Sequence, residues 1–353
     1  MLGERQLKMK RDSTQLGDRF PGKYLIGTGG WSHFRIPGLH PLTAYSKVFN
    51  FVEVNSTFYK IPPQGQIEKW RRTVSPDFHF AVRAHRSITH KNRFQPTRET
   101  LETLEKLERV CQILKAEVIH VQTPPSLEID HVLTNNLQDL ISSSNLGRLR
   151  VALEMRGVEP SRLPPRFVQT MREYNIIHCV DLSKEETPLY ESDVLYSRLF
   201  GRGHHNVYQP TDEELRKVDQ KVLKNRAEKA MLSFHFVRMY KDAARLKIYK
   251  QTGRFPAITK STGISSLEEV LKEDAEFPST KQELMKDQGW KLFDLTASRR
   301  IRVNDLLERL PHKVYSSIRE VLDTSKPLLP VTDTKGQLNN EEASPCSRHG
   351  PED

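Results

Sequence analysis

Polar and charged side chains recur within or just after short apolar segments of this 353-residue sequence. The segment FVEVNSTFY, residues 51–59, is rich in β-branched and aromatic residues, as strands are, yet it contains Glu53 and Asn55. Side chains two residues apart on a strand point to the same face. A buried carboxylate needs a charged or hydrogen-bonding partner. Glu53 therefore faces either water at a sheet edge, an arginine, or a substrate.

Six later segments also end in polar residues. Where a segment has two of them, they are two positions apart and therefore lie on the same face of the predicted strand. These residues are Arg83 and His85, His120 and Gln122, Glu154 and Arg156, Asp181, Arg198, and His235. Scattered surface charge would not recur once per strand. Carboxylates and histidines exchange protons with substrates, and arginines hold anions. The pattern predicts one polar site built from the ends of several strands.

The elements that would position this site alternate between strands and helices. The predicted strand segments are 23–30, 51–59, 78–85, 117–123, 150–157, 176–182, 194–201 and 230–237. Most are separated by amphipathic stretches, and Thr97 and Thr211 stand where helix N-caps are expected. Such alternation indicates a parallel sheet, and eight strands favour a closed TIM (β/α)8 barrel. The sixth connection, SKEETPLYESD, is too short for much helix.

A TIM barrel carries its functional site at the C-terminal mouth, where the strand ends meet. The candidate catalytic residues there are Glu53, Glu154, His85, His235 and Asp181. Glu154 and Glu53 are the candidate acid and base, and the histidines would carry protons near neutral pH. The candidate substrate-binding residues are Trp31, Asn55, Tyr59, Arg83, Gln122, Arg156, Arg198 and Arg202. The alternative is that these Glu and Arg side chains are structural ion pairs.

Two glycine-rich stretches bear on ligand binding. GTGGW, 27–31, has a GxG pattern, but Pro37, Gly38 and Pro41 prevent a helix from opening directly after it, so a dinucleotide site is not expected. LFGRGHHN, 199–206, follows the seventh strand, where TIM barrels often bind phosphate. Its backbone N–H groups, with Arg198 and Arg202, would suit an anion. A solvated basic loop is the alternative.

No metal or other cofactor is expected. The histidines show no HxH or HExxH spacing, and the three cysteines are scattered without a CxxC pair. A divalent site assembled from His85, His120 and His235 with Glu154 or Asp181 stays open as an alternative.

The net charge of +10 fits an anionic small molecule or nucleic acid, because basic residues attract both. No apolar run approaches the roughly 18 residues of a membrane helix, and the N-terminal residues lack the apolar core of a secretory signal. We therefore expect a cytoplasmic protein that does not contact a membrane.

The sequence resembles the YecE-like barrels, domain of unknown function 72. The motifs that carry the resemblance are IGTGGW (26–31), FVEVNSTFYKIP (51–62), FAVRAHRSITH (80–90), VALEMRG (151–157), YSRLFGRG (196–203) and SFHFVRMYKDAARL (233–246). The resemblance implies a TIM barrel and no particular reaction. Many members have an asparagine pair after the eighth strand, where this chain has His235 and then Val237 and Arg238.

The domain organisation follows from these segments. We expect a polar basic N-terminal extension at 1–22, the barrel at 23–255, a linker at 256–276, a small all-helical domain at 277–328 and a disordered tail at 329–353. Thr280 and Glu283 are spaced as a capping box. FPSTKQELM and LLERLPHKVYSS are similar to a second small helical family, domain of unknown function 2795. Such a module suits binding to a protein partner, or packing on the barrel.

Three functions are compatible with these residues. The leading hypothesis is an enzyme acting on an anionic small molecule, such as a phosphorylated one, by general acid/base chemistry, with hydrolase, isomerase and lyase all open. The second is a nucleic-acid-processing or nucleic-acid-binding protein. The third is a non-catalytic scaffold that carries the helical module, with its mouth filled by mutually paired Glu and Arg side chains.

Overall fold

The computed structural model describes residues 23–145, 149–184 and 186–329 of the chain. It divides into two compact units, Met1–Pro256 and Ala257–Asp353. The predicted N-terminal extension at 1–22, and all of the predicted tail at 329–353 except its first residue, lie outside the described residues.

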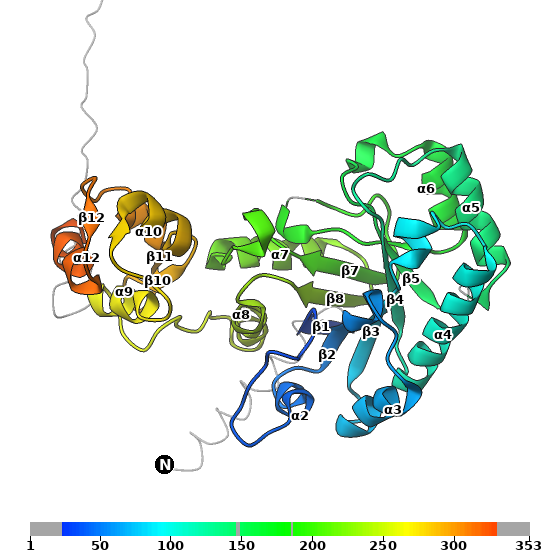
Figure 1. Ribbon diagram of the computed structural model, residues 1–353, viewed down its shortest axis with the longest axis horizontal. Helices are drawn as coiled ribbons and strands as arrows, with labels where there is room; N and C mark the ends of the chain where they lie inside the picture. The colour runs from blue at the N-terminus through cyan, green and yellow to red at the C-terminus, as the bar shows by residue number, and fades with distance from the viewer. Residues whose placement is uncertain (1–22, 146–148, 185, 330–353) are drawn as a thin grey trace, which may run out of the picture. The chain divides into compact units, whose positions relative to one another are not determined.

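The first unit is built on one parallel sheet of eight strands (Figure 1). The strands are β1 (Lys23–Thr28), β2 (Phe51–Val54), β3 (His79–Arg83), β4 (Val118–Gln122), β5 (Arg150–Glu154), β6 (Ile177–His178), β7 (Val194–Leu199) and β8 (Lys229–Phe234). Their order is β6-β5-β4-β3-β2-β1-β8-β7, and a parallel bridge from Val180 to Ser197 joins the two outer strands. The predicted eight-stranded TIM-type barrel is therefore confirmed.

Helices cover the outside of the sheet. They are α2 (Pro41–Ser46), α3 (Gln64–Thr73), α4 (Arg98–Leu114), α5 (His131–Ser142), α6 (Pro165–Glu173), α7 (Asp212–Lys224) and α8 (Met239–Thr252). Thr97 and Thr211 cap α4 and α7 as predicted, each accepting a hydrogen bond from a backbone N–H of the first turn. The connection after β6 has only a short 3₁₀ turn, Leu182–Lys184, among its described residues, as its length predicted.

The inside of the barrel has an apolar layer below a polar one. The apolar layer consists mainly of Leu25, Phe51, Ala81, Val118, Ala152, Ile177, Val194 and Met231. Two residues further along six of these strands stand Glu53, Arg83, His120, Glu154, Cys179 and Tyr196. Because side chains alternate along a strand, both sets face the interior. The polar residues recur at every second position because these positions face the inside of the barrel.

The second unit has its own apolar core and differs from the sequence prediction in two ways. The expected linker at 256–276 contains helix α9 (Ile264–Leu271), whose Leu267, Val270 and Leu271 are fully buried. Their i, i+3, i+4 spacing gives the helix an apolar face that needs a core. Residues 264–271 therefore belong to the folded unit.

The prediction of helices alone at 277–328 is incomplete. Helices α10 (Lys281–Gln288), α11 (Val303–Leu307) and α12 (Ile318–Ser325) are present, and Thr280 with Glu283 forms the predicted capping box. Two antiparallel pairs accompany them: β9 (Ser279–Thr280) with β12 (Val314–Tyr315), and β10 (Leu292–Asp294) with β11 (Arg300–Arg302). Strands of two or three residues are too short to show an alternating pattern.

In the part of the chain that is described, no helix has the length and apolar character needed to cross a membrane.

Gly27 lies where β1 packs closely against the backbone of β2, and a substitution there tests this packing. A Cβ at this position would lie 2.0 Å from the carbonyl oxygen of Phe51, which the backbone could relieve only by moving β1 from β2. We expect Gly27→Ala to lower the free energy of unfolding by about 2 kcal/mol or more, measured by urea denaturation. Gly65→Ala on α3 is the matched control, because a Cβ there meets no atom within 4 Å. Equal stability of the two variants would contradict this account of the barrel wall.

Candidate functional site

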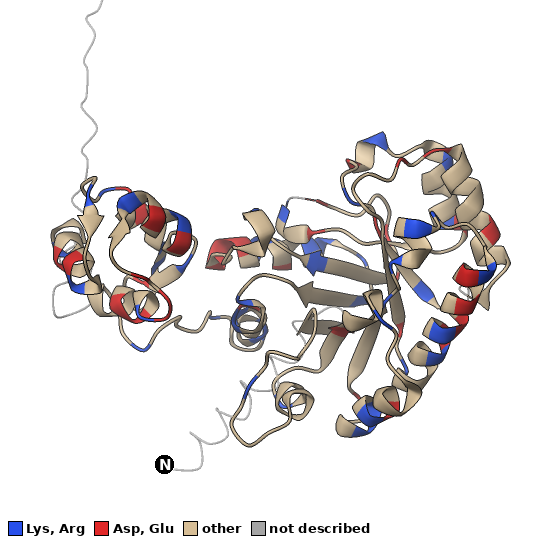
Figure 2. Cartoon of the chain, viewed as in Figure 1, with Lys and Arg blue, Asp and Glu red and all other residues tan. Residues whose placement is uncertain are grey.

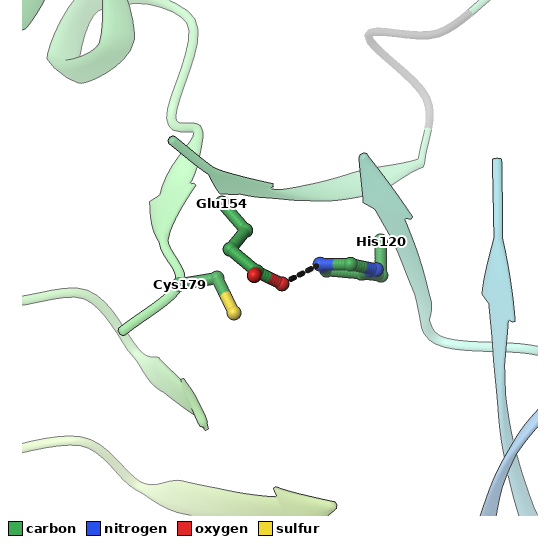
Figure 3. Close-up of side chains that lie close together, drawn as sticks. All are labelled: His120, Glu154 and Cys179. Carbon is green, nitrogen blue, oxygen red and sulfur yellow. Dashed lines mark hydrogen bonds and ion pairs between the residues drawn. The ribbon is translucent and has the colours of Figure 1, made fainter. Parts of the chain in front are cut away.

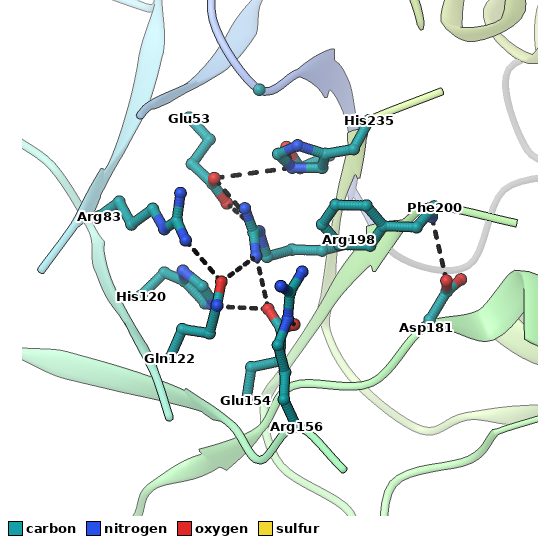
Figure 4. Close-up of polar contacts among 12 residues, drawn as sticks. Glu53, Arg83, His120, Gln122, Glu154, Arg156, Asp181, Arg198, Phe200 and His235 are labelled. Atoms are coloured by element: carbon teal, nitrogen blue, oxygen red, sulfur yellow. Dashed lines mark hydrogen bonds and ion pairs between the residues drawn. The ribbon is translucent and has the colours of Figure 1, made fainter. Parts of the chain in front are cut away.

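The guanidinium of Arg198 lies at the centre of the polar layer and joins three other strands (Figure 4). Its Nε donates to both carboxylate oxygens of Glu53, at 3.2 and 3.0 Å. Its Nη1 donates to Glu154 at 2.6 Å and to the amide oxygen of Gln122 at 3.0 Å. The side chain is only 2% exposed. A buried cation of this kind requires the two carboxylates as counter-ions.

Glu53 is held entirely inside the protein. It is 0% exposed, and the hydroxyl of Tyr196 donates to its Oε2 at 2.7 Å. Burial opposes ionisation of this carboxyl, but the charge of Arg198, assisted by His235 and His120, more than offsets it and lowers the pKa to about 2. Glu53 is therefore a carboxylate at neutral pH and has no proton to give as an acid.

Glu154 is the second carboxylate bound to Arg198, and its side chain is 14% exposed, whereas that of Glu53 is fully buried. It also accepts from Nε of Arg156 at 2.9 Å, and its Oε2 is 3.0 Å from Nε2 of His120. Burial opposes ionisation, yet Arg198, His120 and Arg156 together hold the pKa of Glu154 well below its usual range. Arg156 is 38% exposed, and its two Nη atoms make no hydrogen bond within the described chain.

Arg83 differs from the other two arginines because it touches no carboxylate of the described residues. Its Nη2 donates to Gln122 at 2.6 Å and its Nη1 to Asn55 at 3.2 Å. The guanidinium stacks on Phe58 at 3.7 Å from the ring centroid, and the residue is 9% exposed. Burial, followed by the charge of Arg198, lowers the pKa of Arg83 to about 10. The cation is thus retained at neutral pH without a contacting counter-ion.

His235 lies on the other side of Arg198, stacked on Phe200 with ring centroids 4.6 Å apart. Its Nε2 is 3.0 Å from Ser233 Oγ and 3.6 Å from Glu53 Oε1. Burial and then the charge of Arg198 lower the pKa of His235 well below its usual range, so the imidazole is neutral at pH 7. A Cβ on Gly29 would clash with this ring and with Asn55, so a glycine is required at this position of the GTGGW stretch.

Asp181 and His85 are placed away from the Arg198 network. Asp181 accepts from the backbone N–H groups of Ser183 and Phe200, and it holds the chain after β6 against the chain after β7 (Figure 4). Burial raises the pKa of Asp181 to about 6. His85 is bound through Nδ1 to Ser87 and through Nε2 to the carbonyl oxygen of Tyr59. Both residues fix loops in the structure.

The remaining predicted residues lie towards the periphery. Trp31 packs edge-on against Trp70 of α3, with ring centroids 5.0 Å apart. Tyr59 is 68% exposed beside Phe58, and Arg202 is exposed in the loop after β7. In that loop the backbone N–H of Gly201 already donates to a hydroxyl, that of Ser183 at 3.0 Å. That N–H group, expected to be free for an anion, is therefore occupied.

One cluster could in principle hold a metal ion. The candidate ligand atoms of His120, Glu154 and Cys179 all lie within 4.8 Å of one another (Figure 3). The Oε2 atom of Glu154, which lies beside His120, already accepts a hydrogen bond from Nη1 of Arg198 at 2.6 Å. Burial, with the charge of Glu154, raises the pKa of the Cys179 thiol well above its usual value, so the thiolate that metals prefer is disfavoured. The surrounding charge suits an anion better than a cation.

Four contributors to the site were absent from the predicted catalytic and binding residues: His120, Tyr196, Phe58 and Phe200. His120 shares the parity of the predicted residues, and Tyr196 precedes Arg198 by two, so the alternation could have selected both. Phe58 and Phe200 stack on arginines from outside the strands, and a sequence gives no signal for such stacking.

Comparison with known proteins gives a match over most of the barrel. A family model described as Protein of unknown function DUF72 matches residues 25–251. The UPF0759 protein YecE of Escherichia coli strain K12 is 35% identical over 69 residues, 19% of this chain and 25% of that protein. The chain thus matches about a quarter of the length of this curated relative. The predicted resemblance of 277–328 to domain of unknown function 2795 stays a prediction.

Solved structures share the fold. A DUF72 family protein from Enterococcus faecalis V583 has a TM-score of 0.53 at 18% identity, covering 66% of this chain and 97% of that one. One from Thermotoga maritima MSB8 has a TM-score of 0.54 at 22% identity, covering 64% and 98%. At these identities the likeness concerns the fold alone.

Glu53→Gln tests the buried ion pair. The variant leaves Arg198 with one carboxylate, and we expect the free energy of unfolding at pH 7 to fall by about 3 kcal/mol or more. Glu159→Gln is the control, because its pair with Arg162 is on the surface. A loss no larger than that of the control would contradict the central role of the pair.

The same variant has a pH signature. Glu53 titrates at about 2 in the folded protein, whereas an unperturbed glutamate titrates at 4.5, so its stabilisation is complete above pH of about 4.5 and is lost as the pH falls towards 2. Urea denaturation at several pH values should show a shallower acid dependence for Glu53→Gln than for the native protein. Parallel curves would mean that Glu53 has an ordinary pKa.

Proposed function

Since the chain belongs to the family described as Protein of unknown function DUF72, we propose its function from the site itself: the barrel mouth binds an anionic small molecule and acts on it by proton transfer. The proposal rests on one observation. The network holds three arginines, Arg83, Arg156 and Arg198, against two carboxylates, Glu53 and Glu154. A single anionic group would balance the excess charge.

Arg83 and Arg156 are the residues proposed to hold this anion. Arg83 is charged, largely buried and bound only to neutral amide oxygens, which an anion could replace. Arg156 has two Nη atoms without a hydrogen bond within the described chain. Hydrogen bonds between a guanidinium and an anion are about twice as strong as neutral ones, and low exposure reduces their screening. Asn55 and Gln122 would then orient the ligand.

Proton transfer is assigned to His235 and Glu154. His235 is neutral beside Arg198 and can take a proton from a bound substrate, whose negative charge would favour the imidazolium. Glu154 is an ionised carboxylate at the same network and can act only as a base at neutral pH. Arg156 and Arg83 would stabilise negative charge that develops on the substrate. Glu53 serves as the fixed counter-ion of Arg198 in this scheme.

A non-catalytic scaffold is the second candidate, and the paired charges favour it. Arg198 and Arg156 both contact carboxylates, as a purely structural network would require. Arg83 distinguishes the two proposals. A structural network gains nothing from a buried cation that contacts no carboxylate, whereas a binding site retains one at a cost in stability.

Arg83→Met provides the test. It removes the charge and keeps a long apolar side chain against Phe58. We expect the ligand-free variant to be at least as stable as the native protein, because the cation lacks a carboxylate. We also expect methylphosphonate and small phosphorylated metabolites to raise the melting temperature of the native protein, and the variant to bind them about tenfold more weakly or worse.

Arg98→Met is the matched control, because Arg98 is exposed on α4 and paired with Glu102. It should bind these compounds as the native protein does. If no anion stabilises the native protein, the scaffold candidate stands. If only nucleic acid binds, with a steep dependence on salt concentration, the small-molecule proposal is wrong.

A further inference from the structure

The segment that follows β3 is unusually basic. Residues 83–98, RAHRSITHKNRFQPTR, contain five Lys or Arg residues and no Asp or Glu. Acidic and basic residues are interleaved along the next helix, α4, as Figure 2 shows. Two of the basic residues pair with acidic residues of that helix: Lys91 with Glu99, and Arg98, the first residue of α4, with Glu102.

Arg86 stands apart from these pairs. Its side chain is exposed and makes no hydrogen bond or ion pair within the described chain. The backbone N–H of His90 donates to the carbonyl oxygen of Arg86 at 2.8 Å, a bond that closes one helical turn. Residues four apart on such a turn project from the same face. Arg86, which directly precedes the turn η3 (Ser87–Lys91), and His90 within that turn therefore form one small surface that carries the positive charge of Arg86.

This surface adjoins the anion-binding residues proposed above. The ring of His90 packs edge-on against Phe58 at 5.2 Å, and the guanidinium of Arg83 lies over the same ring at 3.7 Å. The backbone N–H of Arg86 donates to the carbonyl oxygen of Phe58 at 3.0 Å. Phe58 thus connects a recessed cation with two exposed side chains at the rim, the guanidinium of Arg86 and the imidazole of His90.

The turn that carries the two rim residues is fixed to the barrel. Thr89 donates to the carbonyl oxygen of Gln122 at 2.7 Å, and Asn92 N–H donates to Ser87 at 2.8 Å, the wide spacing of a π-turn. Arg93 and Phe94 then have positive φ angles of 48° and 62°, and Phe94 is buried. Strained backbone and π-turns both concentrate at functional sites. The backbone that carries the two rim residues is therefore fixed to the barrel in the absence of a ligand.

We propose that Arg86 and His90 form a second anion subsite beside Arg83 and Arg156, and that the ligand is a small molecule carrying two separate anionic groups. This inference rests on the function proposed above and specifies its substrate class. One group would reach Arg83 inside the mouth, and the other would bind at the rim. The low exposure of Arg83 favours a small molecule over nucleic acid, since a continuous phosphodiester backbone follows an open groove.

The electrostatics of His90 agree with this placement. Burial lowers the pKa of His90, and the charges of Arg83, Arg86 and Arg156 lower it further. These three cations therefore act on one position, and no carboxylate is among the main influences on it. An anionic group bound there would be attracted by all of them.

Phosphonates that differ only in the number and spacing of their charges test the proposal. We would measure binding of methylphosphonate and of propane- and hexane-bisphosphonate to the native protein by calorimetry, at fixed pH and ionic strength. At least one bisphosphonate should bind about tenfold or more tightly than methylphosphonate. Arg86→Gln should remove that advantage and leave methylphosphonate binding within about twofold. Arg98→Gln is the control and should change neither.

The outcomes separate this inference from the function on which it rests. If methylphosphonate binds in an Arg83-dependent way but no bisphosphonate binds more tightly, the second subsite does not exist and the proposed function survives. If Arg86→Gln weakens both kinds of ligand equally, Arg86 acts through general charge and the inference is wrong. If no phosphonate binds, both proposals fall. Tighter binding of an oligonucleotide than of any bisphosphonate would also overturn the two-group small molecule.

Discussion

The buried contact of Arg198 with Glu53 and Glu154 is the interaction on which the rest of the structure depends. Each of the three side chains would be costly to bury alone, and together they balance to one net negative charge. The contact joins β7 to β2 and β5 across the barrel interior, so it requires the sheet to be closed. Closure in turn depends on the apolar layer below it, which fills the barrel floor.

Arg83 and Arg156 change the net charge of this network from negative to positive. With both included, the network carries one net positive charge, at the end of the barrel where TIM barrels bind their ligands. The charge of Arg198 keeps both glutamates ionised, and burial together with that charge keeps His235 neutral. In the proposed function, this one electrostatic arrangement would attract an anion and accept a proton. We expect that burying Arg83 without a contacting carboxylate lowers stability, as is typical of residues kept for binding.

The sequence predicted the barrel and the inner face of its strands. The alternation of residue types within segments such as FVEVNSTFY indicates which side chains point inward, because the direction of each side chain is set locally along a strand. It did not predict which charges pair. Glu53 and Arg198 are 145 residues apart, and their contact depends on the diameter and register of the closed barrel. For the same reason Asp181 and His85, which share the pattern of the site, were assigned to chemistry although they bind loop residues.

The chain after β1 and the second unit also contain contacts between distant residues that the sequence did not reveal. The sequence of the GTGGW stretch did not reveal that Gly29 makes room for His235 and Asn55, because these residues follow other strands. The pairing of β9 with β12 joins segments of two residues, which no periodicity could reveal. Local signals such as the capping box of Thr280 and Glu283 were predicted correctly because both partners lie within one turn.

The position of a bound anion tests the central claim most directly. Crystals of the native protein equilibrated with methylarsonate at neutral pH would locate the anion through the anomalous scattering of arsenic. The account predicts a peak at the C-terminal mouth, with arsonate oxygens within hydrogen-bonding distance of Arg83 and Arg156. A peak elsewhere on the surface, or an empty mouth at saturating arsonate, would contradict it.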